Sequence, residues 1–225
     1  MILNMFITIL IKYLSQIFKK EVPMPDPTPS PVPTPTPAPI PTVSPFDSTD
    51  LPLILIFEGG FTDNINDHGG RTNKGITQRN YDDYRQKKGL SLADVKNISD
   101  SEVHEIYLNG YWLPSKCSQM PPKVSTVVFD SSVNCGQARS IMTVQKAIGA
   151  KVDGIIGSET LSKIKGLDPT ILANSFLDNK VVFYKALVQQ DATQQLFLSG
   201  WLRRVQFLRD FVNGVKTLGQ IKASW

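Results

Sequence analysis

The stretch from Leu53 to Thr77, LILIFEGGFTDNINDHGGRTNKGIT, attaches one carboxylic acid to the end of an apolar segment and follows it with a polar, glycine-rich loop. The acid is Glu58. A carboxyl at the end of a buried helix is partly desolvated, and the negative end of the helix dipole acts in the same direction, so its pKa rises. A carboxyl that stays protonated near neutral pH can serve as a general acid. This stretch therefore suggests a catalytic acid beside a substrate cleft.

The loop after Glu58 carries residue types that such an acid needs around it. Gly59 and Gly60 leave room for a bulky substrate, while Asp63 and Asp67 lie where water keeps a carboxylate ionised. Two carboxyls whose surroundings push their pKa values apart are typical of enzymes that cleave glycosidic bonds. An acid followed by glycines is also common at helix ends, so a purely structural interpretation stays open on these residues alone.

Helical patterns predominate after residue 48, and these helices must position the acid. Asp50, as N-cap, and Pro52 predict the start of the helix that ends at Glu58. Gly89 and Gly110 are expected to end the next two helices. The first of those two is expected over 77–88, and the second begins at the capping-box pattern of Ser99 and Glu102. The others are expected over 122–134, 137–148, a short segment after 158, 168–190 with Asp168 as N-cap, and 193–215. Only the loop 61–75 has hairpin character, so we expect a mainly α fold with at most a small β-hairpin.

The first 47 residues differ from this body. Residues 1–20 are apolar except for one narrow polar stripe. An 18-residue helix in this segment is roughly 27 Å long, against a hydrocarbon core of roughly 30 Å. We expect a membrane-associated helix, with a helix packed on the body as the alternative. Residues 23–45 have proline at nearly every second position, which favours an extended spacer over residues 21–47. A ligand for a proline-binding domain is the competing interpretation.

Composition excludes several classes of function. The net charge of +4 suits a polyanionic partner such as the cell wall, but no dense run of basic and aromatic residues indicates a nucleic-acid site. Only two histidines and two cysteines are present, so no metal and no cofactor is predicted. Two buried free thiols at Cys117 and Cys135 are favoured over a disulfide.

Several motifs, in order, together resemble the glycoside hydrolase family 108 muramidases. The first are Glu58-Gly59-Gly60, the acidic loop, Gly69-Gly70 and Gly75-Ile76-Thr77. EIYLNGYWLP (105–114) and VVFDSSVNCG (127–136) resemble two helices of the family, and VDGIIGSETL (152–161) with FLSGWLRRV (197–205) resemble its peptidoglycan-binding-type region. The resemblance covers roughly 51–217. It implies a lysozyme-like domain over residues 48–135 and a peptidoglycan-binding-type helical region over 136–225.

The resemblance also implies roles for individual residues. Glu58 matches the catalytic acid of the family. In the spacing of phage-type lysozymes, Asp67 stands at the position of the second carboxylate and Asn73 at that of a threonine, with Thr72 one residue early. We expect Glu58, Asp67 and Thr72 to be catalytic, with the role of the threonine open between Thr72 and Asn73 and with Asp63 as the substitute for Asp67.

The residues expected to contact substrate share a place near this loop or on the 105–114 segment; they are Gly59, Gly60, Asp63, His68, Asn73, Tyr111 and Trp112. His68 lines the cleft or is simply exposed. Tyr111 and Trp112 stack on sugars or anchor the core. Asp130 and Asn134, one helical turn apart, brace the cleft or form a structural polar pair.

The expected activity is hydrolysis of the β-1,4 bond between N-acetylmuramic acid and N-acetylglucosamine in the glycan strand of peptidoglycan. A phage or prophage endolysin is the first setting, and a secretion-associated muramidase the second. A lytic transglycosylase acting on the same bond and a non-catalytic wall-binding module are the competing functions. The expected location is the bacterial inner membrane, with the body acting on the cell-wall side.

Overall fold

The computed structural model of the chain describes residues 44–63 and 70–225. The expected membrane helix, the linker up to residue 43, Asp67 and His68 lie outside these residues. Within the described ranges, no helix is long and apolar enough to cross a membrane. The membrane association of residues 1–20 stays a prediction.

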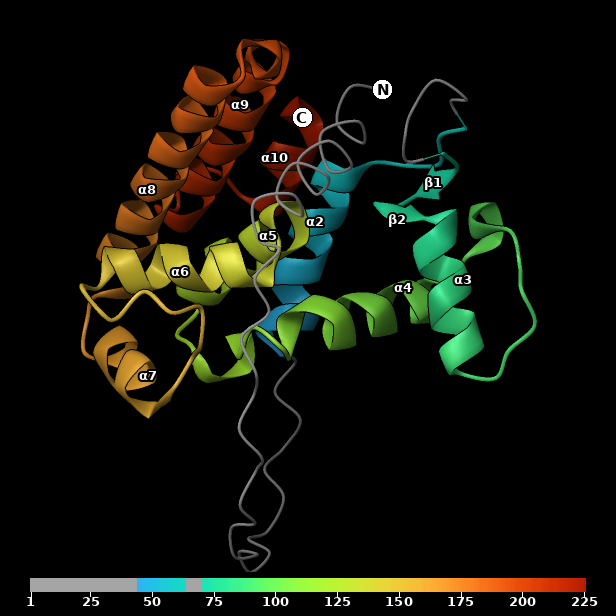
Figure 1. The fold of residues 1–225 in the computed structure, drawn as a ribbon, viewed down its shortest axis with the longest axis horizontal. Coiled ribbons are helices and arrows are strands. Elements are labelled where there is room, and N and C mark those ends of the chain that lie inside the picture. Colours follow the sequence, from blue (N-terminus) through green and yellow to red (C-terminus); the bar gives the residue numbers. More distant parts are fainter. Residues whose placement is uncertain (1–43, 64–69) are drawn as a thin grey trace, which may run out of the picture.

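The body is mainly helical, as predicted, and helix α2 (Leu51–Glu58) lies near its middle (Figure 1). The apolar run makes this helix buried on most of its surface, and Leu53, Ile54 and Phe57 are fully buried. Glu58 is the last residue of the helix, as the sequence indicates. Gly59 then leaves helical geometry with φ of 72°.

The predicted N-cap role of Asp50 is wrong. A π-helical turn, η1 (Phe46–Asp50), leads directly into α2, and the Asp50 side chain makes no capping hydrogen bond. Its carboxylate instead accepts hydrogen bonds from Thr126 Oγ1 at 2.6 Å and Ser125 Oγ at 3.2 Å, in the buried interior. Because an unpaired buried carboxylate is costly, these two hydroxyls explain how an acid can lie there.

A small antiparallel hairpin, β1 (Thr72–Asn73) and β2 (Ile76–Thr77), confirms the expected β element. Lys74 and Gly75 form its turn with φ of 48° and 78°, the geometry of a two-residue type I′ turn, for which glycine is favoured at the second position. Thr62 bridges to Thr72, so the segment after α2 returns to the hairpin.

Two helices follow the hairpin, and Figure 1 shows them to one side of α2. Helix α3 (Gln78–Lys87) ends before Gly89, as predicted, and a short turn η2 (Val95–Asn97) leads to α4 (Asp100–Tyr107). The expected capping box between Ser99 and Glu102 is present. The expected stop at Gly110 is wrong, because the helical backbone continues through it as a π-helical turn, η3 (Leu108–Trp112).

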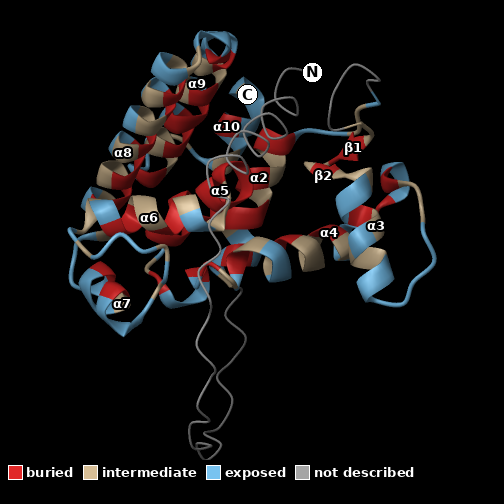
Figure 2. Cartoon of the chain, in the orientation of Figure 1, coloured by how far each residue is buried: buried red, intermediate tan, exposed pale blue. Residues whose placement is uncertain are grey.

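Helix α5 (Val124–Cys135) follows a short turn, η4 (Cys117–Gln119), and every one of its 12 residues is buried. It joins the first part of the chain to the second, since α6 (Gln137–Ala147) and α8 (Pro169–Gln190) both pack on it. Figure 2 shows the buried residues of these helices facing one another across a common interior. Cys117 and Cys135 are both free and buried, as favoured from the sequence.

The rest of the chain is a helical layer on α5. Helix α7 (Ser158–Lys165) is short, and α8 begins with Asp168 as N-cap, as predicted. After a short turn η5 (Ala192–Gln194), α9 (Gln195–Val212) runs back along α8 (Figure 1). A last helix, α10 (Leu218–Ser224), was not expected from the sequence; it contacts α2, with Trp225 edge-on to Phe57 at 4.8 Å.

Candidate active site

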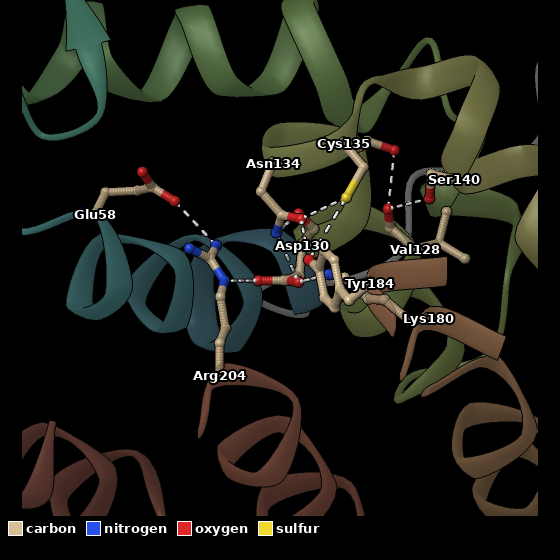
Figure 3. A network of polar contacts seen from close by, with 10 residues as sticks. Glu58, Val128, Asp130, Asn134, Cys135, Ser140, Lys180, Tyr184 and Arg204 are labelled. Carbon is tan, nitrogen blue, oxygen red and sulfur yellow. Dashed lines mark hydrogen bonds and ion pairs between the residues drawn. The ribbon is translucent and has the colours of Figure 1, made fainter. Parts of the chain in front are cut away.

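Glu58 lies in the interior, at the point where α2, α9 and the hairpin turn meet. It is 2% exposed. Its Oε1 accepts a hydrogen bond from Arg204 Nη2 of α9 at 2.9 Å, which is also an ion pair (Figure 3). Its Oε2 is buried and accepts no hydrogen bond from the described residues. The two oxygens of this carboxyl therefore have different surroundings.

Arg204 connects Glu58 to a second buried carboxylate. Its Nε donates to Asp130 Oδ1 of α5 at 2.7 Å, and Asp130 Oδ2 accepts from Lys180 Nζ of α8 at 2.5 Å (Figure 3). Asn134 Nδ2 also donates to Asp130 Oδ2, at 2.9 Å. The expected polar pair of Asp130 and Asn134 is thus confirmed, and through Arg204 it reaches the expected catalytic acid.

The pKa values of the two carboxyls move in opposite directions. Burial raises the pKa of Glu58 above its usual value of 4.5, because the attraction of Arg204 and its hydrogen bond only partly offset the desolvation. Burial would likewise raise the pKa of Asp130, but two cations, Arg204 and Lys180, contact it and bring its pKa below 3.8. One carboxyl of the pair is therefore held toward the protonated form and the other toward the ionised form.

The hairpin turn forms the wall beside Glu58. A Cβ atom placed on Gly75 would lie 2.9 Å from Glu58 Oε2 and 2.5 Å from the hydroxyl oxygen of Tyr107. Tyr107 donates that hydroxyl to the carbonyl of Lys74 at 2.7 Å, which ties α4 to the turn. The glycine of the GIT motif is thus required for both its positive φ and its close approach to the acid.

The two polar residues expected to assist the acid, Thr72 and Asn73, both bond to backbone carbonyls. Thr72 is buried in β1, and its hydroxyl donates to the carbonyl of Gly70 at 3.2 Å. Asn73 donates its amide to the carbonyls of Val95 and Lys96, so that side chain holds the turn η2 against the hairpin. The roles of Thr72 and Asn73 toward a substrate stay predictions.

Asp63 is exposed and faces a cation. Its carboxylate lies 3.4 Å from Arg71 Nε, and Arg71 also pairs with Asp94 at 2.7 Å. Gly59 and Gly60 are exposed, and a Cβ atom at either would meet nothing within 4 Å. Among the described residues nothing therefore covers these two glycines, whereas the Glu58 carboxyl itself is buried.

Of the two aromatic residues expected to bind sugar, one is buried. Trp112 is 4% exposed and packs against Phe46 and Phe129, with ring centroids 5.3 and 5.4 Å apart, so its ring presents no face to a sugar. The core interpretation is correct for this residue. Tyr111 is half-buried, and burial together with the charge of Glu58 raises its pKa.

Tyr111 also belongs to a surface depression of about 510 Å³ between α3 and α4. It is lined by Asn80, Asp83, Tyr84, Lys87, Lys88, Glu105, Ile106, Asn109, Gly110 and Tyr111. Tyr111 thus links this depression to the electrostatic surroundings of Glu58. Its sugar-binding role stays a prediction.

Arg204 and Lys180 were missed by sequence reasoning as members of the site. Arg204 is 146 residues from Glu58, inside the segment FLSGWLRRV, where it stands three residues after Trp201 and next to Val205, at the spacing of the apolar face. That periodicity was the only available signal. Lys180 gave none beyond its place in an otherwise apolar face of α8. Among the described residues, no group of three or more histidine, cysteine, aspartate or glutamate side chains is placed to hold a metal ion.

The chain is similar to known proteins over two successive stretches. Residues 51–136 match the model of the family described as glycosyl hydrolase 108, and residues 139–206 match that of a predicted peptidoglycan domain. Among solved structures, SagA of Brucella abortus is 28% identical, with a TM-score of 0.62 over 74% of this chain and 93% of that one. No curated protein matches the sequence.

The helical fold, the buried acid and these two matches define a glycoside hydrolase that acts on peptidoglycan. The chain thus combines a stretch similar to glycosyl hydrolase family 108 with a following stretch similar to a predicted peptidoglycan domain.

Proposed function

We propose that this protein hydrolyses the β-1,4 bond between N-acetylmuramic acid and N-acetylglucosamine, with Glu58 as the general acid. The observation that supports this most is the asymmetry of the Glu58 carboxyl. Arg204 occupies Oε1, whereas Oε2 is buried without a partner among the described residues. A guanidinium can only donate hydrogen bonds, so the oxygen that it contacts must accept. The protonated carboxyl therefore carries its proton on Oε2. Oε2 then donates to the glycosidic oxygen as the bond breaks.

Asp67 is the proposed anionic partner. It follows Glu58 at the spacing of phage-type lysozymes and lies outside the described residues. An ionised carboxylate across the sugar ring from the acid either activates water or stabilises the positive charge of the transition state. Thr72 is the proposed polar assistant, and Asp63 the substitute for Asp67.

A lytic transglycosylase is the second candidate, and one observation favours it. Of the carboxylates in the described residues, Asp130 has the largest effect on Glu58, and Asp130 is itself paired with two cations. A single acid is sufficient for the transglycosylase reaction, which ends in 1,6-anhydromuramic products. The two reactions therefore differ in whether Asp67 is needed.

Purified full-length protein and its Glu58→Gln and Asp67→Asn variants, incubated with isolated peptidoglycan, test the proposal. We expect reducing muramic acid ends by mass spectrometry, loss of release in Glu58→Gln, and a large loss in Asp67→Asn. Anhydro ends together with an active Asp67→Asn variant would establish the transglycosylase instead. Undiminished release by a folded Glu58→Gln variant would exclude Glu58 as the acid.

We further propose that residues 1–20 tether the enzyme to the inner membrane and that residues 21–47 are a spacer, as in a phage or prophage endolysin; a secretion-associated muramidase is the alternative setting. The apolar helical pattern and the proline alternation support this arrangement. Protease digestion of intact spheroplasts tests it. Cleavage of the body from outside indicates a wall-facing enzyme, and full protection before lysis would contradict that orientation.

A further inference from the structure

We propose that Arg204 is a positioning residue for the catalytic acid, so that the predicted peptidoglycan domain completes the active site as well as contacting the wall. This inference rests on the proposed role of Glu58. Arg204 lies in α9, within the 139–206 match, whereas Glu58 lies within the 51–136 match. Each of these two sequence units therefore supplies one half of the ion pair.

The contact is geometrically specific. The guanidinium donates Nη2–H to Glu58 Oε1 and Nε–H to Asp130 Oδ1, so one rigid planar group fixes the separation of two carboxylates (Figure 3). It also lies over the ring of Phe57, with its central carbon 4.8 Å from the ring centroid. Arg204 itself is only 4% exposed, so water does not compete strongly for these bonds.

Asp130 and Lys180 hold Arg204 in this place. Asp130 uses one oxygen for Arg204 and the other for Lys180, and Asn134 and Tyr184 extend the network through hydrogen bonds of 2.9 and 3.1 Å. A buried arginine with a single partner would be costly, whereas one shared by two carboxylates is compensated. The network therefore fixes the rotamer of Glu58 and leaves only Oε2 for chemistry.

If Arg204 only held the two domains together, it would make the same bonds. The test therefore has to measure a property of the acid itself, namely its pKa. The charged and titratable groups that face Glu58 are Arg204 of α9, Asp130 of α5, Lys180 of α8, Tyr107 of α4 and Tyr111 of η3. The basic limb of the pH profile of kcat/KM reports the pKa of the acid in the free enzyme. Removing the positive charge of Arg204 and removing the negative charge of Asp130 should move that limb in opposite directions.

The experiment measures kcat/KM against pH on isolated peptidoglycan for the full-length protein and three variants. In Arg204→Gln a nearby positive charge is lost, so the basic limb should shift to higher pH. In Asp130→Asn the positive charges of Arg204 and Lys180 lose their counter-charge, so the limb should shift to lower pH. Arg204→Lys keeps the positive charge but loses the planar guanidinium that bonds both carboxylates. The basic limb of its profile should therefore stay at the same pH, while its maximal rate falls about 10- to 100-fold.

Arg203→Gln is the matched control, because this neighbouring arginine donates to the terminal carbonyls of Ser224 and Trp225 and makes no bond to Glu58. Its profile should equal that of the parent protein. Circular dichroism and sedimentation with cell walls, measured for every variant, should show an intact fold and unchanged wall binding. If Arg204→Gln does not fold, Asp130→Asn and Arg204→Lys still give the shift and the rate effect.

Two results would overturn the inference. One is a folded set of variants whose basic limbs coincide with that of the parent, and the other is a shift in the same direction for Arg204→Gln and Asp130→Asn. Glu58→Gln, measured in the same series, distinguishes failure of the positioning role of Arg204 from failure of the proposed catalytic role of Glu58. An inactive Glu58→Gln with unmoved profiles removes only the positioning role, whereas an active Glu58→Gln removes the catalytic assignment.

Discussion

Helix α2 carries a buried carboxyl at each end, Asp50 just before its first residue and Glu58 at its last. Burial raises the pKa of both, to about 6 for Asp50. Both oxygens of Asp50 are used, each by one hydroxyl of α5. Glu58 instead has one oxygen on Arg204 and one without a partner among the described residues. A raised pKa therefore does not distinguish the proposed catalytic acid from the structural one, whereas the carboxylate oxygen without a partner does.

The largest expected difference between the two acids is in rate. Glu58→Gln should lower the release of reducing ends by about 10²- to 10⁴-fold, the usual contribution of a general acid. The amide oxygen can still accept from Arg204, so the fold should remain. Asp50→Asn should leave the rate near that of the parent protein. Equal losses in the two variants would remove the distinction between them.

Gly75→Ala should have the next largest effect. The new methyl group would lie within 3 Å of Glu58 Oε2 and of the Tyr107 hydroxyl, on a backbone with φ of 78°. We expect a loss of about 2–5 kcal/mol in the free energy of unfolding from overpacking and backbone strain, together with lost activity. Urea denaturation measures the first. Gly89→Ala, with φ of 68° and nothing within 4 Å, is the control and should cost only the strain.

Asp50 should control the pH dependence of stability. Its pKa in the folded protein is raised from 3.8 to about 6, so its contribution is fully present below pH 3.8 and is lost as the pH rises through 6. The free energy of unfolding of the parent protein should therefore fall relative to that of Asp50→Asn between pH 4 and 7, by up to about 3 kcal/mol. Denaturation at several pH values checks this, and parallel curves would contradict it.

Thr126→Val should have the smallest effect. It removes the shorter of the two hydrogen bonds to Asp50, so the free energy of unfolding at pH 7 should fall by about 1–3 kcal/mol. Activity per folded molecule should stay constant, because Thr126 makes no contact with Glu58. A loss of rate larger than the loss of folded protein would show that the two ends of α2 are coupled.

The first part of the site was predictable because its signals are local. The apolar run before Glu58, the glycines after it and the turn at Gly75 are adjacent in the sequence, and each has a direct physical meaning. The capping box at Ser99 and the N-cap at Asp168 were predictable for the same reason. Asp50 stood at a position typical of an N-cap, but tertiary hydrogen bonds to α5 were available and outweighed the local preference.

The other part of the site depends on distant residues. Arg204 meets Glu58 only because α9 folds back along α8 and onto α5, and Lys180 meets Asp130 across 50 residues of chain. A charged side chain in an amphipathic helix usually faces water, so helical spacing was the only reason in the sequence to place either one in the interior. Trp112 was equally ambiguous, since an aromatic ring has the same identity in a core and in a sugar site.

The protonation of Glu58 can be observed directly by NMR. Protein labelled with ¹³C at the glutamate side-chain carboxyl would be titrated, with Glu58→Gln used to assign its signal. We predict a midpoint above the usual 4.5 that coincides with the basic limb of the pH profile of kcat/KM. A midpoint at or below 4.5, or one that does not coincide with the basic limb, would contradict the role of Glu58 as the acid.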